Sequence, residues 1–451
     1  MVAEALTTKG FSRAAVEELS AVKAEPDWLR AWRLAAWEAW EAIPMPTRQD
    51  EDWRRTDIRA LDLGAYAPYT VPDGTTSGTA RDGTAGGAGP APALGRLAKR
   101  GSDLGGLLVQ QDAAAVRRDA SDALAAQGVV FADLDTVVRE HGDLVRRHLG
   151  SVVPADANKF AALNAALWSS GSFVYVPRGV AVELPLSALV WQETPGAALF
   201  PRTLIVVERG ASLTFIAESR SADQDLPALH DGVVELCVGE GAQVRYVGLQ
   251  RWGGHVWSFS TERADLARDA RVQWVVVGLG ARLTKSYVQT RLLAPGGQAR
   301  LVGVVLGAGK QHFDYHTLQE HVAPHTSSDL LFKTALKDQA RSVFVGLIHV
   351  EKTAQQTDSY LANRNLVLSD GAKADSIPRL EIEANDVRCT HGATVAPVDP
   401  EQIFYLETRG LPRDDAERMI VEGFFEPILE EIPAETVRER VRTALAEKTA
   451  A

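Results

Sequence analysis

A short pattern that recurs at intervals of 28 to 31 residues is the feature that most constrains the fold of this chain. Each copy starts with a polar or glycine-containing turn and an alanine, and polar and apolar residues then alternate. The copies read ERGASLTF, GEGAQVRY, ARDARVQW and GGQARLVG. Their alanines are separated by 31, 28 and 29 residues: Ala211, Ala242, Ala270 and Ala299. A period of this length indicates an architecture of stacked, similar units.

The residues within each copy alternate as they do in a β-strand. Val244 and Tyr246 fall on one face, and Gln243 and Arg245 fall on the other. A propeller would need a longer repeat of about 40 residues. We therefore predict a mainly β protein with helical ends, whose core over residues 156–396 is a parallel β-helix with two or three short strands per coil. Similar turns at Ala340 and Ala372 extend the pattern.

The segments on either side of this core differ from it in composition and in predicted secondary structure. Residues 1–67 are predicted to be helical, because Trp28, Trp32 and Trp40 recur on one helical face. Residues 68–100 are rich in Gly, Pro and Thr, and we expect a flexible segment there. Residues 101–155 are predicted to be a small α/β or helical segment, with helices over 112–126 and 133–149. Residues 397–451 are predicted to be helical, with Asp399 as the first N-cap.

Charge and composition narrow the class of protein. The chain has 451 residues, a net charge of −11 and no run of lysine and arginine, so we expect no binding to nucleic acid or anionic lipid. No apolar stretch reaches about 18 residues, and we expect no membrane span. Two cysteines cannot form a disulfide framework, which favours the reducing cytoplasm. Phosphate-loop, nucleophile-elbow and dinucleotide motifs are all absent, so we expect that the chain does not hydrolyse ATP by itself.

The sequence DVRCTHGAT places Cys389 and His391 two residues apart. In a strand these side chains share one face, and a thiolate with an imidazole suits iron, zinc or copper. Two ligands do not make a complete site, so another coil or another chain would have to supply the rest. The alternative is that the pair has only a structural role, since so short a motif often arises by chance.

A second set of candidate ligands lies in GKQHFDYHTLQEHVAPHTSSD. His312, Asp314 and His316 alternate onto one strand face, and two imidazoles with a carboxylate resemble the facial triad of iron sites. The alternative is a set of polar residues facing solvent. Cys237 lies in an apolar strand and is predicted to be a small buried residue. A carbohydrate-active β-helix is also considered, although acidic residues scatter into turns rather than gathering in a groove.

Several long segments resemble the SufB/SufD family of the SUF iron–sulfur cluster assembly machinery. They include SSGSFVYVPRGVAVELPL, HTLQEHVAPHTSSD and KADSIPRLEIEANDVRCTHGATVAPVDPEQIFYLETRG, and the resemblance covers residues 164–433. It implies a right-handed parallel β-helix between helical ends. It also implies a scaffold that works in a complex of SufB, SufD and two copies of the ATPase SufC.

Two positions make the chain most similar to SufD. The place of the cysteine thought to accept sulfur in SufB falls at about Asn363, and asparagine cannot form a persulfide. SufB-type chains tend to read HEAT after the histidine, whereas Gly392 replaces the glutamate here. The alternative is a SufB-like primary scaffold in which Cys389 accepts sulfur.

The resemblance also implies a site and its partners. His391, with Cys389 beside it, would face SufB, and a transient iron–sulfur cluster or iron would be shared there, with no tightly bound cofactor. The last strands, over residues 360–395, would dock SufB, or a second copy of the chain in isolation. The helices after Asp399 would bind SufC through the following apolar residues: Phe404, Met419, Ile420, Phe424 and Phe425.

Overall fold

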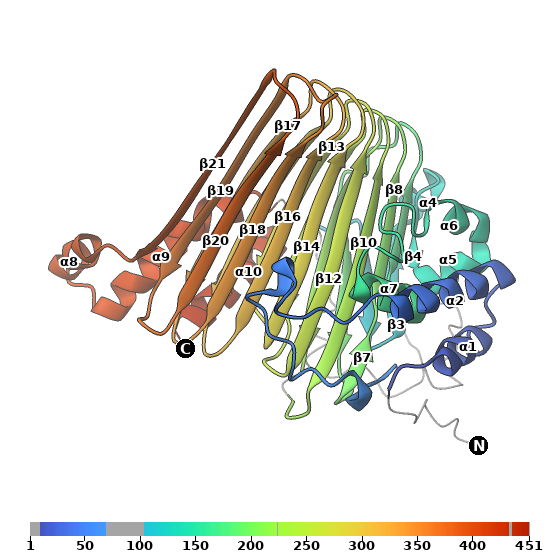
Figure 1. The fold of residues 1–451 in the computed structure, drawn as a ribbon, viewed down its shortest axis with the longest axis horizontal. Helices are drawn as coiled ribbons and strands as arrows, with labels where there is room; N and C mark the ends of the chain where they lie inside the picture. Colours follow the sequence, from blue (N-terminus) through green and yellow to red (C-terminus); the bar gives the residue numbers. More distant parts are fainter. Residues whose placement is uncertain (1–9, 69–102, 223, 433–434, 451) are drawn as a thin grey trace.

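Two long parallel sheets, stacked face to face, form the body of the protein in a computed structural model that describes residues 10–68, 103–222, 224–432 and 435–450 (Figure 1). The chain alternates between the sheets, so that each coil adds one strand to each of them. Parallel pairing continues coil by coil to the last strands. The predicted parallel β-helix with helical ends is therefore confirmed, with two strands in each coil.

The first sheet, sheet A, has 11 strands and the second, sheet B, has 10. Sheet A contains β1 (Ala67–Pro68), β4 (Val130–Asp133), β5 (Ser172–Val176), β7 (Ala197–Leu199), β8 (Arg202–Val207), β10 (Ala228–Val238), β12 (Val256–Leu266), β14 (Leu283–Leu292), β16 (His312–His321), β18 (Arg341–Val350) and β20 (Lys373–Ile382). Sheet B contains β2 (Gly106–Gln111), β3 (Ala114–Ala120), β6 (Leu186–Gln192), β9 (Ser212–Ser221), β11 (Gln243–Arg251), β13 (Arg271–Gly278), β15 (Gln298–Gly307), β17 (Ser327–Leu336), β19 (Thr357–Val367) and β21 (Val387–Pro397).

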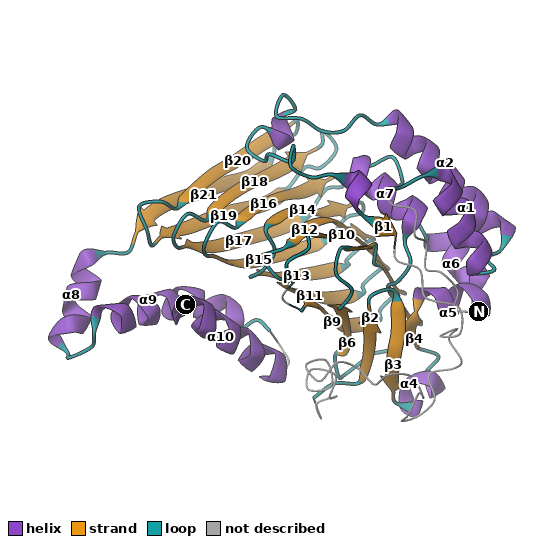
Figure 2. Ribbon diagram, turned by 90° about the horizontal axis from the view of Figure 1, so that it is seen from below, coloured by secondary structure: helices purple, strands orange, loops and turns teal. Residues whose placement is uncertain are grey.

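Helices cover the first coils of this body and one side of it (Figure 2). The N-terminal and linking helices pack around the first coils: α1 (Arg13–Val22), α2 (Asp27–Ala42), α4 (Asp122–Ala126), α5 (Leu134–Glu140), α6 (Gly142–His148) and α7 (Lys159–Leu167). Two single 3₁₀ turns, η1 (Glu51–Trp53) and η2 (Leu63–Ala65), follow α2. The C-terminal helices are α8 (Pro400–Thr408), α9 (Arg413–Leu429) and α10 (Glu435–Ala450). Helices α9 and α10 cover the outer face of sheet B with an apolar layer. Asp399 caps α8 by accepting a hydrogen bond from Glu401 N, as predicted.

The alanine of the sequence repeat marks the turn that enters sheet B. Ala211, Ala242 and Ala270 are fully buried there, and each follows a residue with a left-handed backbone, two of which are glycines. The expected alignment of Ala299 with these residues is wrong. Arg271 pairs with Gln298, so Ala299 lies inside β15, two residues past the equivalent position. The repeat therefore predicted the architecture but misaligned one coil.

The segment before the predicted core contributes to both sheets. Strand β2 pairs in parallel with β6, and β4 pairs with β5, so the sheets begin before residue 156. The helix predicted over residues 112–126 is wrong over most of its length, because Ala114–Ala120 forms β3 antiparallel to β2. Pairing with the apolar strand β2 outweighs the helix propensity of its alanines and arginines. The Gly/Pro/Thr-rich segment predicted over 68–100 lies outside the described residues, apart from Pro68.

An acidic side chain interrupts the core between the two sheets. Glu262 pairs in register with Val234 and Val288, which both belong to the core, so its carboxyl points inward as well. Burial raises the pKa of Glu262 from its usual 4.5 to about 7, although a hydrogen bond with Ser260 acts in the opposite direction.

Replacing Glu262 with glutamine is expected to stabilise the protein more at pH 8 than at pH 5. Between pH 4.5 and 7 the Glu262 carboxyl is protonated in the folded state and ionised in the unfolded state. The free-energy cost of ionising it in the core therefore grows over this range and is complete above pH 7. The stabilisation at pH 8 should reach up to about 3 kcal/mol. Urea unfolding at both pH values measures it, with the exposed Glu183→Gln as the control. An equal effect at pH 5 and pH 8 would contradict this assignment.

Candidate functional site at the open end of the β-helix

The last coil of the β-helix has no further strand covering it. Strand β20 ends sheet A and β21 ends sheet B, on the same side of the molecule (Figure 1). Side chains that are buried in earlier coils are therefore exposed here. Ile382 is 40% exposed and Val395 is 50% exposed, whereas their register partners Val350 and Asn365 are buried. Unpaired strand edges with exposed apolar side chains are typical of a surface that pairs with another chain.

Cys389 and His391 both face the interior of this open coil. His391 pairs with Leu361, which is fully buried, and Cys389 pairs with the buried Ser359. Side chains at paired positions of a parallel sheet point the same way. The predicted strand and the predicted shared face are therefore both confirmed.

Each of the two residues ends a long internal column. The column below His391 is entirely apolar: Leu361, Leu330, Leu301, Trp274, Tyr246 and Phe215. The column below Cys389 changes from apolar to polar near the open end, where Ser328 Oγ lies 2.6 Å from Ser359 Oγ. Placing an imidazole at the end of an apolar column has no packing advantage.

The surroundings of the two side chains differ. Cys389 is half-buried against the core, and burial, with a smaller contribution from the Asp358 carboxylate, raises the pKa of its thiol. His391 is exposed. The thiol therefore stays protonated at neutral pH until a cation or a metal ion favours the thiolate. An exposed imidazole beside such a thiol can supply two iron ligands and leaves the others to a second chain.

Asn363 is fully buried in the strand next to the site. Its amide donates to Phe332 O at 3.3 Å, and its Oδ1 accepts a hydrogen bond from Asn365 at 2.7 Å. Asn365 in turn donates to Thr394 O of β21 at 3.0 Å. The position where the resemblance places a sulfur-accepting cysteine is thus part of an amide network that supports the last strand.

The second candidate set lies on the outer face of sheet A. His312, Asp314 and His316 share this face, as predicted. Asp314 forms an ion pair of 2.9 Å with Lys285 and also accepts from Thr56, while His316 Nε2 lies 3.0 Å from the same carboxylate. No group of three or more His, Cys, Asp or Glu side chains in the described part of the chain is arranged to hold a metal ion. Metal binding by this set stays a prediction.

Burial and the neighbouring charges shift the pKa values of Asp314 and His312. The Lys285 ammonium and the contact with His316 outweigh the effect of burial, and they lower the pKa of Asp314 to about 2. Burial lowers the pKa of His312, although Asp314 acts in the opposite direction. Sequence analysis missed Lys285 and Thr56, because both come from segments far from the histidines in the chain.

Cys237, predicted to be buried, lies about 150 residues before Cys389 in strand β10 and is half-buried. Its Sγ is 3.9 Å from Ser151 Oγ, and burial raises the pKa of the thiol to about 12. Sheet A places it away from the open end, in contact with the helices that cover the first coils. It therefore does not complete the Cys389–His391 pair.

The C-terminal helices present an exposed apolar surface. Phe404 is 67% exposed, Tyr405 is 57% exposed and Met419 is 56% exposed. Phe425 is instead fully buried against sheet B. Phe424 lies under Lys333, whose ammonium is 4.9 Å from the ring. The predicted apolar stripe is thus divided between internal packing and an exposed part.

The fold and its open end define a class: a β-helical protein with two candidate ligand side chains at an uncovered edge. The SUF system FeS cluster assembly, SufBD core domain model matches residues 190–424, and the SufBD protein N-terminal region model matches residues 107–187. The chain belongs to the SufBD family of iron–sulfur cluster assembly proteins. This assignment replaces the carbohydrate-active alternative.

Curated relatives match over nearly the whole chain. Iron-sulfur cluster assembly protein SufB of Bacillus subtilis is 32% identical over 427 residues, which cover 95% of this chain and 90% of the relative. An iron-sulfur cluster assembly SufBD family protein of Staphylococcus epidermidis has the same identity and coverage. Because these relatives carry the name SufB or the family name, the closer similarity to SufD stays a prediction. Among the described residues, no helix is long and apolar enough to cross a membrane.

Proposed function

We propose that this chain is a SufD-like, non-enzymatic scaffold subunit that works with a SufB-type subunit in the cytoplasm. The observation that carries the proposal is the uncovered last coil, in which Cys389 and His391 replace buried core residues. The buried Asn363 supports the SufD-like assignment, because its amide cannot accept sulfur as a thiol does.

In this proposal the open coil docks on the matching end of a SufB-type chain. Ile382 and Val395 would be covered on docking, since they are the exposed large apolar residues that face the interior of the open coil. The nascent iron–sulfur cluster, or iron, is cargo held between the chains, and Cys389 and His391 supply two of its ligands. In isolation, two copies of this chain could cover the same edge.

The C-terminal helices are proposed to bind the ATPase SufC. Helix α8 lies away from the β-helix (Figures 1 and 2). Its exposed Phe404 and Tyr405 form a short apolar surface on a helix, which suits insertion into a groove of a partner. ATP-driven pairing of two SufC subunits would pull on α8 and α9 and open the interface that covers the site. This requires the ATP-bound state to favour the open interface.

Co-expression with SufB and SufC, followed by purification through a tag on this chain, tests the proposal. A three-component complex is expected. After incubation with a sulfur donor, mass spectrometry should find the persulfide on SufB and none on Cys389. The Phe404→Asp variant should retain SufB and reduce SufC by about tenfold or more, because a central apolar contact is lost. Val22→Asp, at another exposed apolar position, serves as the control.

The second candidate is a SufB-like primary scaffold, which the name of the Bacillus subtilis relative favours. In that case the same experiment would find a persulfide on Cys389. A chain that captures neither SufB nor SufC would contradict both candidates. Retention of SufC by Phe404→Asp would contradict only the assignment of α8 as its docking surface.

A further inference from the structure

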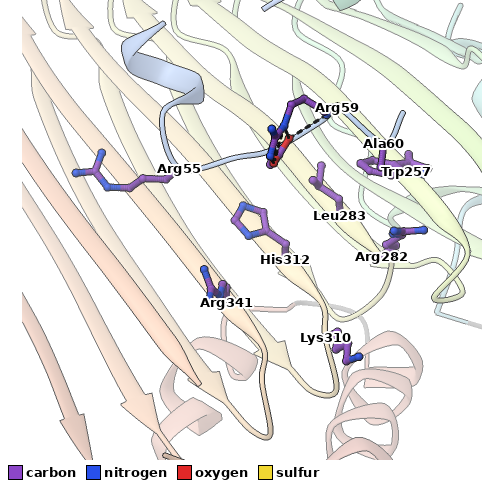
Figure 3. A pocket seen from close by; sticks show the side chains of 10 residues that line it. Arg55, Arg59, Ala60, Trp257, Arg282, Leu283, Lys310, His312 and Arg341 are labelled. Carbon is purple, nitrogen blue, oxygen red and sulfur yellow. Dashed lines mark hydrogen bonds and ion pairs between the residues drawn. The ribbon is translucent and has the colours of Figure 1, made fainter. Parts of the chain in front are cut away.

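A basic pocket of about 590 Å³ lies on the outer face of sheet A (Figure 3). The chain segment after η1 crosses the beginnings of β14, β16 and β18 and forms one wall of this pocket. The residues that line it are Arg55, Asp57, Arg59, Ala60, Trp257, Arg282, Leu283, Lys310, His312 and Arg341.

The positive charges of the pocket are mostly uncompensated. Its only acidic residue, Asp57, is paired with Arg59 at 2.6 Å. Within the part of the chain that the structure describes, the remaining four cations make no ion pair: Arg55, Arg282, Lys310 and Arg341. Like charges around one cavity repel each other and favour a bound anion. This is unexpected in a chain with a net charge of −11.

The fold brings the basic residues of the pocket together from distant parts of the sequence. The sequence therefore contains no run of basic residues that would predict the pocket. Arg55 comes from the N-terminal segment, while Arg282, Lys310 and Arg341 come from three successive entries into sheet A. Figure 3 shows the basic side chains arranged around the ring of His312. The guanidinium of Arg282 lies 5.0 Å from the Trp257 ring, which helps to orient it.

The floor of the pocket is held in place by the buried polar set of sheet A. Thr56 donates its hydroxyl proton to Asp314, and His312 Nε2 lies 2.9 Å from the same hydroxyl oxygen. The Thr56 hydroxyl oxygen therefore accepts a hydrogen bond from His312 Nε2. The other ring nitrogen, Nδ1, has no hydrogen-bond partner among the described residues. Leu283 and Trp257 add an apolar surface beside it.

We propose that this pocket binds a small molecule carrying two or more phosphate groups. One arginine guanidinium can donate two parallel hydrogen bonds to the oxygens of one phosphate group. Several cations spread around one cavity therefore suit a ligand with several phosphate groups better than a single phosphate. The volume falls within the range of small-molecule sites, and the apolar Leu283 and Trp257 can contact an uncharged part of the ligand. The proposal is independent of the iron–sulfur role, because the pocket shares no residue with the last coil.

Calorimetric titration of the full chain with inorganic pyrophosphate, at fixed ionic strength, tests this inference. Saturable binding of one pyrophosphate per chain is expected, with orthophosphate at least tenfold weaker. The double variant Arg282→Gln, Arg341→Gln should weaken pyrophosphate binding by at least tenfold, because two charged hydrogen-bond donors are lost. The exposed Arg268→Gln, which removes the same type of charge in another turn, should bind as wild type.

Three outcomes would overturn the proposal. They are the absence of saturable binding, equal affinity for orthophosphate, and an unchanged affinity in the double variant. Tight binding of a polyglutamate peptide that pyrophosphate does not displace would instead assign the pocket to an acidic protein segment. The substituted arginines are exposed and make no ion pair among the described residues, so both variants should fold, which circular dichroism checks.

Discussion

A complex assembled with His391→Ala is expected to keep its subunits and to lose its iron–sulfur cluster. His391 is exposed at the open edge of the last strand, so its loss should leave the fold unchanged. Removing a metal ligand should cost at least the 10- to 100-fold in affinity that is typical of residues supporting a ligand. Iron and acid-labile sulfide per complex should therefore fall to about a tenth of wild type or less.

Thr390→Ala provides the matched control for this prediction. Thr390 lies between Cys389 and His391 on the same strand, and its side chain is exposed on the opposite face. The control should bind cluster as wild type does. Cys389→Ser should resemble His391→Ala, because serine is a poor ligand for iron compared with a thiolate. Wild-type cluster content in His391→Ala with an intact complex would leave His391 with no ligand role.

The architecture could be predicted because a solenoid repeats the same local rules in every coil. Alternation within GEGAQVRY and the spacing of the turns were sufficient, since each coil buries its apolar face against its neighbours. The structure of β3 could not be predicted, because its Ala114–Ala120 sequence has no strand alternation of its own. Only the apolar partner strand β2 makes it a strand, and that information lies outside the segment.

The candidate site was predictable only in part for the same reason. Strand periodicity places Cys389 and His391 on one face, and the end of the repeat suggests an open edge. Contacts between distant segments could not be predicted. The ion pair of Lys285 with Asp314 joins residues on neighbouring strands, and Thr56 reaches the same carboxylate from the N-terminal segment. The basic pocket depends on equally distant arginines, so the sequence showed no basic cluster.

Loss of a buried ion pair is expected to have the second large effect, which is on the stability of the protein. The pair joins Arg202 of β8 to Glu235 of β10, beside the loop after α6. Arg202 and Glu235 have no solvent exposure, and the guanidinium donates two hydrogen bonds to Glu235 Oε1, at 2.6 and 3.0 Å. The same carboxylate accepts from three backbone N–H groups of the loop after α6: those of Gly150, Val152 and Val153. Glu235 therefore neutralises the buried guanidinium charge and also accepts the hydrogen bonds of three backbone N–H groups of the loop.

Glu235→Ala is expected to destabilise the protein by about 3–5 kcal/mol, measured as the free energy of unfolding in urea. The substitution leaves the Arg202 guanidinium buried without its counter-charge and three backbone donors without acceptors. Replacing both partners, as in Arg202→Met with Glu235→Leu, should recover part of the loss, because no unpaired charge remains buried. The exposed pair of Arg13 and Glu38 is the control, and Glu38→Ala should unfold close to wild type. If Glu235→Ala unfolds at the same urea concentration as Glu38→Ala, the carboxylate does not hold the loop after α6 against the first coils.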